Sequence, residues 1–170
     1  MRAAIIGGGA AGMYAAVMLA QAGHSVTIYE KNEKLGKKLF ITGKGRCNLT
    51  NNCEVEELMK HVVTNPKFLY SAFYNCNAQD VMQFFEQNGL KLKTERGNRV
   101  FPASDHSSDV IKTLEQALNK RKVTVRLNHM VTGILTEPAH DRMQNQMRVT
   151  GICVKDEKGL QKQEHYDAVI

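Results

Sequence analysis

A glycine-rich turn lies between two short apolar runs near the start of the chain. Residues 3–6 are apolar, and the sequence Gly-Gly-Gly-Ala-Ala-Gly follows at once at 7–12. Apolar residues then recur at helical spacing as far as Ala20, and residues 26–29 predict a second strand that ends at Glu30. This order of strand, glycine turn, helix, strand and acid predicts a parallel βαβ unit.

The spacing within this unit indicates that it binds a dinucleotide. Gly7 permits the tight turn out of the strand, Gly9 lets the backbone approach a pyrophosphate, and Gly12 lets the helix pack closely against the sheet. The free amides and the dipole at the start of the helix favour the diphosphate anion. Glu30 follows at close to the spacing of about 20 residues expected for an acid that hydrogen-bonds a ribose hydroxyl. The expected cofactor residues here are Gly7, Gly9, Ala10, Ala11, Gly12, Glu30 and Lys31.

Composition excludes some classes of protein and leaves others open. Hydrophobic residues make up 42% of the 170 and charged residues 24%, as in an ordinary globular domain. No apolar run approaches the roughly 20 residues that cross a bilayer, so we expect no membrane association. The four cysteines form no CxxC pair, which favours reduced thiols and a cytoplasmic location. The six histidines show no metal-ligand spacing, so no metal site is expected.

The net charge of +6 fits either nucleic acid or an anionic cofactor as the partner. Part of the excess gathers in one loop, at Lys31, Lys34, Lys37, Lys38, Lys44 and Arg46. Residues 31–52 show no regular pattern, and a loop of this length inside a compact domain is usually functional. Its glycines permit close approach of a ligand, and Arg46 has the planar geometry that suits a phosphate. A solvated surface loop is the open alternative.

Several motifs of the chain resemble one family of bacterial flavoproteins. They are GGGAAGMYAA at the N-terminus, EKNEKLGKKL after the second strand, TGKGRCNLTN in the loop, and ERGNRVFP at 95–102. The family comprises NAD(P)/FAD-dependent oxidoreductases described as YhiN-like, BaiN/RdsA-like or aminoacetone oxidase-like. The resemblance implies that the loop lies along FAD, with Lys38, Gly45, Arg46, Cys47 and Asn48 near the cofactor. Lys44 departs from the family, because many relatives have a glycine there.

The middle of the chain predicts a helical insertion, at about 54–102. Helices are expected at 54–63, 66–74 and 78–88, followed by a hairpin of strands at 90–94 and 99–102. Asn77 with Asp80 predicts an N-terminal cap for the third helix. A further helix to about Lys120 and a strand at 123–127 return the chain to the parallel sheet.

The last part of the chain favours FAD over NAD. Residues 130–136, 147–155 and 160–164 alternate apolar and polar residues, with a polar connection at 137–146, and predict an antiparallel β-meander at about 130–165. A meander in place of another helix is what FAD domains of the glutathione-reductase type carry. Resemblance to that superfamily implies that the backbone near Val131 meets the adenine. The expected fold is therefore α/β, a Rossmann-like FAD-binding domain.

Residues 166–170 predict a further parallel strand, and the resemblance then implies that residues 1–170 are the N-terminal part of a longer protein, without its substrate domain. The main hypothesis is a flavin-dependent oxidoreductase that transfers hydride between NAD(P)H or FAD and an unsaturated or amine substrate. The substrate is a small molecule or RNA, with uridine in ribosomal RNA as one candidate, and NAD(P)H is a possible reductant. Two alternatives stay open: a non-catalytic module that senses redox state, and a flavin disulfide reductase that uses Cys47 and Cys53. No catalytic residue and no oligomeric state are assigned.

Overall fold

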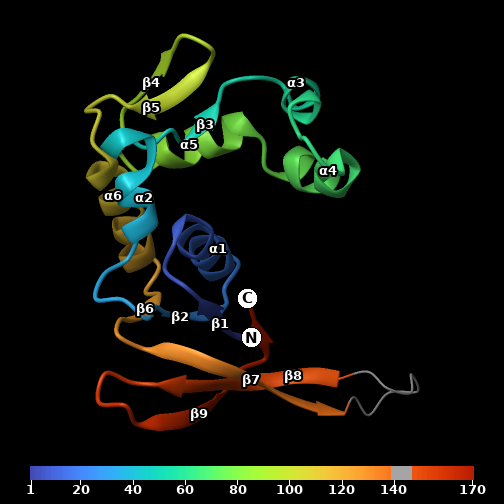
Figure 1. Cartoon of the computed structure of the whole chain (residues 1–170), viewed down its shortest axis with the longest axis vertical. Helices are drawn as coiled ribbons and strands as arrows, with labels where there is room; N and C mark the ends of the chain where they lie inside the picture. The colour runs from blue at the N-terminus through green and yellow to red at the C-terminus, as the bar shows by residue number, and fades with distance from the viewer. Residues whose placement is uncertain (139–146) are drawn as a thin grey trace. The chain divides into compact units, whose positions relative to one another are not determined.

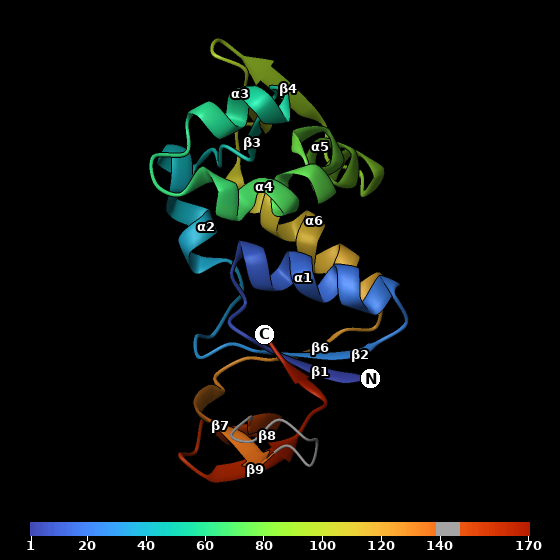
Figure 2. The same ribbon diagram turned by 90° about the vertical axis from the view of Figure 1, so that its right-hand side faces the viewer.

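The computed structural model describes residues 1–138 and 147–170 (Figures 1 and 2). They form two compact units. The first unit comprises residues 1–37 and 114–170, and the second unit comprises residues 38–113. The expected helical insertion at 54–102 falls within the second unit. Among the described residues, no helix is long and apolar enough to cross a membrane.

The first unit is built on a parallel sheet with the strand order β10-β1-β2-β6. Its strands are β1 (Arg2–Ile6), β2 (Ser25–Tyr29), β6 (Thr124–Arg126) and β10 (Ala168–Val169). The three central residues of β1 are at most 3% exposed, as expected for a strand covered on both faces. Helix α1 (Ala10–Gln21) covers one face through Met13, Ala16 and Val17, which are fully buried (Figure 1). The expected parallel α/β fold is confirmed.

An antiparallel meander covers the other face of this sheet (Figures 1 and 2). Its strands, in the order β7-β8-β9, are β7 (Met130–Pro138), β8 (Met147–Lys155) and β9 (Gln161–His165). Ile152 and Val154 of β8 pack with Ala4, Tyr29 and Tyr166 in one buried cluster. The connection expected at 137–146 begins later than predicted, because β7 continues through Pro138. The remainder, 139–146, lies outside the described residues.

The second unit holds helices and a small antiparallel sheet of order β3-β5-β4. Its strands are β3 (Thr50–Asn51), β4 (Leu92–Glu95) and β5 (Arg99–Pro102). The helices that lie wholly or partly within it are α2 (Lys37–Ile41), α3 (Val55–Lys60), α4 (Pro66–Asn75), α5 (Ala78–Gln87) and α6 (Ser107–Lys120). The predicted cap of α5 is confirmed as a full capping box, in which Asn77 and Asp80 each accept the other's backbone N–H.

Two predictions of local structure were wrong. Residues 31–52 are not without regular structure, because α2 and a short 3₁₀ turn (Thr42–Gly45) lie within them. Thr42 Oγ1 donates to Leu39 O over 2.7 Å and links these two pieces, which are too short to show a periodic pattern. The helix expected at 54–63 ends at Lys60, and the N–H groups of His61 and Val62 bond carbonyls three residues back, which tightens the last turn.

Candidate cofactor-binding site

The glycine turn of the first unit begins directly after β1. Gly7 has φ +104°, a backbone conformation that favours glycine, and its N–H donates to Tyr29 O over 2.8 Å. A Cβ added to Gly12 would lie 2.0 Å from Gly7 O and 3.2 Å from Ile5 Cγ2. The packing of α1 against β1 therefore requires glycine at position 12, whether or not a ligand is bound.

Gly9 has no such reason within the folded chain. Its φ of −81° and ψ of −176° are open to any residue, and an added Cβ would meet no atom within 4 Å. It stands at the N-terminus of α1, where Ala10 and Ala11 are also exposed. In the described part of the chain no side chain caps this helix, and its first turn holds no acid. The start of α1 thus presents backbone amides and a positive dipole to solvent, which suits an anion.

Glu30 directly follows β2 and is only 8% exposed. Its Oε2 accepts the N–H of Gly8 over 2.7 Å, and its Oε1 accepts the backbone N–H and the side-chain amide of Asn32 over 2.8 and 2.6 Å. Burial raises the pKa of Glu30, but the bonds from Asn32 and Gly8, with Lys31 nearby, outweigh it and hold the pKa below its usual value. The carboxylate is therefore ionised at neutral pH and ties the glycine turn to the end of β2.

The other expected residues of the first unit lie close to Glu30 along the chain or across the sheet. Lys31 is exposed and contributes to the low pKa of Glu30. Glu30 N–H donates to Arg126 O over 2.9 Å, and Glu30 O accepts from His129 N–H over 3.0 Å. Val131 follows two residues later, at the start of β7, half-buried against the core cluster. The structure thus brings the glycine turn, Glu30 and the start of β7 to one end of the sheet.

In the second unit, the expected cofactor loop is an unusually bent turn. Gly43, Lys44, Gly45 and Cys47 all have φ between +56° and +84°. At Lys44 this conformation strains a side chain that glycine would not have. Lys38 is exposed on α2, and Cys47 is buried. The amide of Asn48, oriented toward the carbonyl oxygens that face it, donates to Thr50 O and Val100 O.

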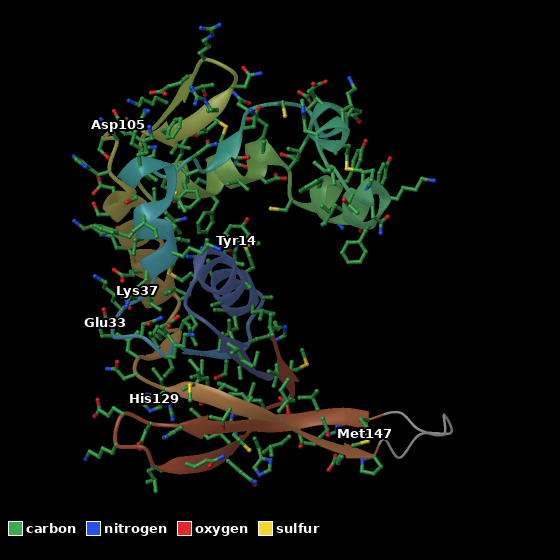
Figure 3. All side chains as sticks on the ribbon, viewed as in Figure 1. Tyr14, Glu33, Lys37, Asp105, His129 and Met147 are labelled. Carbon is green, nitrogen blue, oxygen red and sulfur yellow. The ribbon has the colours of Figure 1, made fainter. Side chains whose placement is uncertain are left out.

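Arg46 is held by acidic and aromatic side chains of its own unit. Its Nε donates to Asp105 Oδ1 over 2.7 Å, a second nitrogen pairs with Glu95, and its Cζ lies 4.2 Å from the ring centroid of Phe101. Lys93 Nζ donates to Asp105 Oδ2 over 2.6 Å, so two cations balance two carboxylates. Figure 3 labels Asp105 in the loop after β5. The guanidinium that was expected to meet a phosphate thus also links the bent turn to β4 and to this loop.

We expect Arg46→Gln to lower the melting temperature of the flavin-free chain. Of the two cations in this group Lys93 then remains, and it has to balance both Glu95 and Asp105. Arg96→Gln is the matched control, since Arg96 is an exposed arginine in the tip of the β4–β5 hairpin. Thermal unfolding followed by circular dichroism would compare the three proteins. Equal melting temperatures would leave Arg46 with no structural role and favour contact with a ligand alone.

Three contributors to the site were not predicted. The motif was interpreted through Gly7, Gly9 and Gly12, yet the N–H of Gly8 is the one that binds Glu30, and an added Cβ there would lie 2.2 Å from Leu35 Cδ2. The unbroken run of three glycines was the available signal. Asn32 could have been noticed as an amide two residues after the acid. The pairing of Asp105 with Arg46 had no sequence signal, because 59 positions separate the two residues.

Two further kinds of site to consider in this chain are a metal centre and a reactive cysteine. Over residues 1–138 and 147–170, no group of three His, Cys, Asp or Glu side chains could hold a metal ion. In the described residues, none of the four cysteines forms a disulfide. Burial raises the pKa of the Cys47 thiol, although a hydrogen bond with Thr42 lowers it in part. A thiolate nucleophile requires the opposite shift, which speaks against a disulfide reductase that uses Cys47.

Comparisons with known proteins give a family model and several curated relatives that match the chain. Residues 1–157 match the family model described as the HI0933-like protein Rossmann domain. A 3-dehydro-bile acid delta(4,6)-reductase of Clostridium scindens is 35% identical over 126 residues, which cover 73% of this chain and 30% of that protein. A ribosomal RNA dihydrouridine synthase of Escherichia coli is 30% identical over 156 residues, 92% of this chain and 37% of that protein. The chain thus spans about a third of the length of the curated relatives it matches.

Solved structures share the fold at low sequence identity. The 3-ketosteroid-delta4-(5alpha)-dehydrogenase from Rhodococcus jostii superposes with a TM-score of 0.74 at 14% identity, over 99% of this chain and 44% of that one. The 3-ketosteroid delta1-dehydrogenase from Sterolibacterium denitrificans gives 0.69 at 17% identity, over 97% of this chain and 46% of that one. These similarities establish the architecture of the chain.

Proposed function

The chain belongs to the family of HI0933-like Rossmann domains, and we propose that it is the FAD-binding part of a flavin-dependent oxidoreductase. The observation that carries the proposal is Gly9. It lies at the open N-terminus of α1, and no described atom lies within 4 Å of an added Cβ to require glycine there. A pyrophosphate that approaches the backbone supplies the missing reason.

The meander supports FAD rather than NAD as the cofactor. In the described residues, β7, β8 and β9 cover the face of the parallel sheet that lies opposite α1. Glu30 and the start of β7 lie together at the end of β2, which would place the ribose and the adenine at this edge of the sheet. The amides at the start of α1 would hold the diphosphate, and Glu30 would accept hydrogen bonds from the ribose hydroxyls.

Bound FAD supplies hydride transfer, while the chain supplies binding and orientation. The first unit by itself offers an anion site at the start of α1 and the ionised carboxylate of Glu30. We propose NAD(P)H as the reductant, from the resemblance of the chain. The free cysteines further support a cytoplasmic location as part of this proposal.

The names of the relatives support an unsaturated substrate. One is named as a delta(4,6)-reductase of a bile acid and two as synthases of dihydrouridine in ribosomal RNA, and both names describe the reduction of carbon–carbon double bonds. We propose the same kind of reaction here, on a small molecule or on uridine in RNA. A non-catalytic redox-sensing module is the alternative. The complete gene product would then bind FAD but neither accept hydride from NAD(P)H nor reduce an acceptor.

Gly9→Ala should weaken FAD binding about tenfold or more, equivalent to about 1.4 kcal/mol, because the added methyl lies where the pyrophosphate approaches. Folding should be little affected, since alanine is only a somewhat weaker N-cap, at a cost of about 1 kcal/mol or less. Titration of the flavin-free gene product with FAD, followed by flavin fluorescence, gives the dissociation constant.

Ala22→Gly is a suitable control, because Ala22 lies at the opposite end of α1 and is exposed. It should leave FAD affinity unchanged. A Gly9→Ala protein that binds FAD as tightly as the wild type would remove the pyrophosphate from the start of α1, and the proposed function would lose its main support.

A further inference from the structure

A chain of polar groups lies beneath the strand end that carries Glu30. The Tyr29 hydroxyl donates to Glu164 Oε2 over 2.8 Å and lies 2.6 Å from the Tyr166 hydroxyl. Arg126 Nη1 donates to Glu164 Oε1 over 2.6 Å. These four residues, named here the Tyr29 cluster, come from β2, β6, β9 and the segment before β10. They therefore join the parallel sheet to the meander.

All hydrogen bonds of the Tyr29 cluster are donated toward Glu164. Tyr29 is 1% exposed and Tyr166 6%. Burial, together with the hydrogen bonds to Tyr166 and Glu164, raises the pKa of Tyr29, so its hydroxyl stays protonated. A phenol has one proton, and that of Tyr29 points to Glu164, so Tyr166 donates to Tyr29. Glu164 thus accepts from Tyr29 on one oxygen and from Arg126 on the other.

Stability alone is a weak reason for such a cluster. Burying two hydroxyls and partly burying an ion pair costs solvation, and apolar side chains of similar volume often stabilise a fold as well or better. Hydrogen bonds are directional, however, and a satisfied network specifies one arrangement of the elements that carry it. Arg126 also lies over the Tyr29 ring, with 5.6 Å between Cζ and the ring centroid. The cluster thus fixes how β9 lies against the ends of β2 and β6.

The cluster is connected to Glu30 on two sides. Tyr29 precedes Glu30 in the chain, and Arg126 O accepts the Glu30 N–H over 2.9 Å. The Glu30 carbonyl in turn accepts from His129 N–H, and β7 begins at the next residue. His129 lies with its ring centroid 6.4 Å from that of Tyr29, at the junction labelled in Figure 3. A shift of Tyr29 or Arg126 would therefore move both Glu30 and the start of β7.

We propose that the Tyr29 cluster positions the adenosine half of the cofactor by holding Glu30 and the start of β7 in the geometry that binds ribose and adenine. Tyr29, Arg126, Glu164 and Tyr166 are positioning residues, because they act through Glu30 and the β7 backbone rather than on the reacting atoms. The inference rests on the proposed function. It assigns the Tyr29 cluster a role in cofactor binding in addition to its role in the fold.

The test uses Tyr29→Phe, Glu164→Gln and Arg126→Gln in the complete gene product. Isothermal titration calorimetry at pH 7 measures the affinity for FAD and for ADP, which carries the adenosine diphosphate without the flavin ring. Each variant should bind both about tenfold more weakly and by the same factor, as expected for loss of one buried hydrogen bond to a charged group. The absorption spectrum of bound FAD should not change. Glu157→Gln removes an exposed charge from the turn between β8 and β9, and should bind like the wild type.

A merely structural cluster would give a different result. The variants would unfold at lower denaturant concentration, yet bind FAD and ADP with unchanged affinity at a temperature where all are folded, and this would overturn the positioning role alone. A wild-type protein that binds no FAD would overturn the proposed function together with this inference. Arg126→Gln decides the matter if the other variants do not fold, because the Arg126 side chain is 40% exposed and its replacement disturbs the core least.

Discussion

Gly12→Ala should lower the free energy of unfolding of the flavin-free chain by about 3 kcal/mol or more. The added Cβ would lie 2.0 Å from Gly7 O and 3.2 Å from Ile5 Cγ2. The first of these contacts is with backbone, so no side chain can rotate away, and α1 has to move off β1. Overpacking of a core typically costs about 1–3 kcal/mol and occasionally more. A clash with backbone belongs at the upper end of that range, which is a large part of the 5–15 kcal/mol that holds a typical domain together.

Urea unfolding followed by circular dichroism would measure the loss. Gly9→Ala is the matched control, because it makes the same change three positions earlier, where an added Cβ meets nothing within 4 Å. The pair separates the two functions of the motif: position 12 should affect the stability of the flavin-free chain, and position 9 its affinity for FAD. A Gly12→Ala chain with wild-type stability would show that α1 does not need to pack this closely on β1.

Much of the fold followed from local patterns. The apolar runs at 3–6 and 26–29, with the helix between them, predicted parallel strands because a glycine turn and a helix link them. The structure pairs Ala3 with Val26 and Ile5 with Ile28 in that sheet. The meander followed equally from alternation, which persists over strands as long as β7 and β8. Long periodic segments determine their own structure.

Short and bent segments could not be predicted in this way. Helix α2 has five residues, fewer than two turns, and the turn after it depends on positive φ angles at Gly43, Lys44 and Gly45. The sequence shows glycines there but not how the backbone bends, because glycine is compatible with many conformations. The Arg46 contacts were missed for a related reason. Arginine suits phosphate and carboxylate equally, and its carboxylate partners come from distant parts of the chain.

At the candidate site, the motif identified the residues but not their bonds to one another. Glu30 was predicted as a ribose ligand, which stays a prediction. What the sequence did not reveal is that its carboxylate already accepts three hydrogen bonds from Gly8 and Asn32. A carboxylate has about four acceptor positions, so a ribose hydroxyl would use the remaining one or displace Asn32. Spacing shows that an acid is present, whereas only the fold shows how it is held.

Glu30→Gln should therefore weaken both the fold and FAD binding. The carboxylate accepts N–H groups on both oxygens, whereas an amide has one oxygen and one NH₂ group. The new NH₂ group would then face either the Gly8 N–H or the two N–H donors of Asn32, at a site that is 8% exposed. A buried donor left unsatisfied costs about 1–3 kcal/mol, and loss of a charged hydrogen bond to ribose would weaken FAD binding by about 1.5–3 kcal/mol.

The pH dependence gives this prediction a sharper test. The pKa of Glu30 is lowered in the folded chain, so ionisation favours folding above its unfolded pKa of about 4.3, and this stabilisation is lost as the pH falls through the lower, folded value. The difference in free energy of unfolding between wild type and Glu30→Gln should be full at pH 7 and shrink in acid. Glu157→Gln is the control, because Glu157 is exposed in the turn between β8 and β9. If the difference in free energy of unfolding stays constant down to pH 3, Glu30 stabilises the fold by its packing and not by its charge. The ionised carboxylate would then have no part in holding the glycine turn.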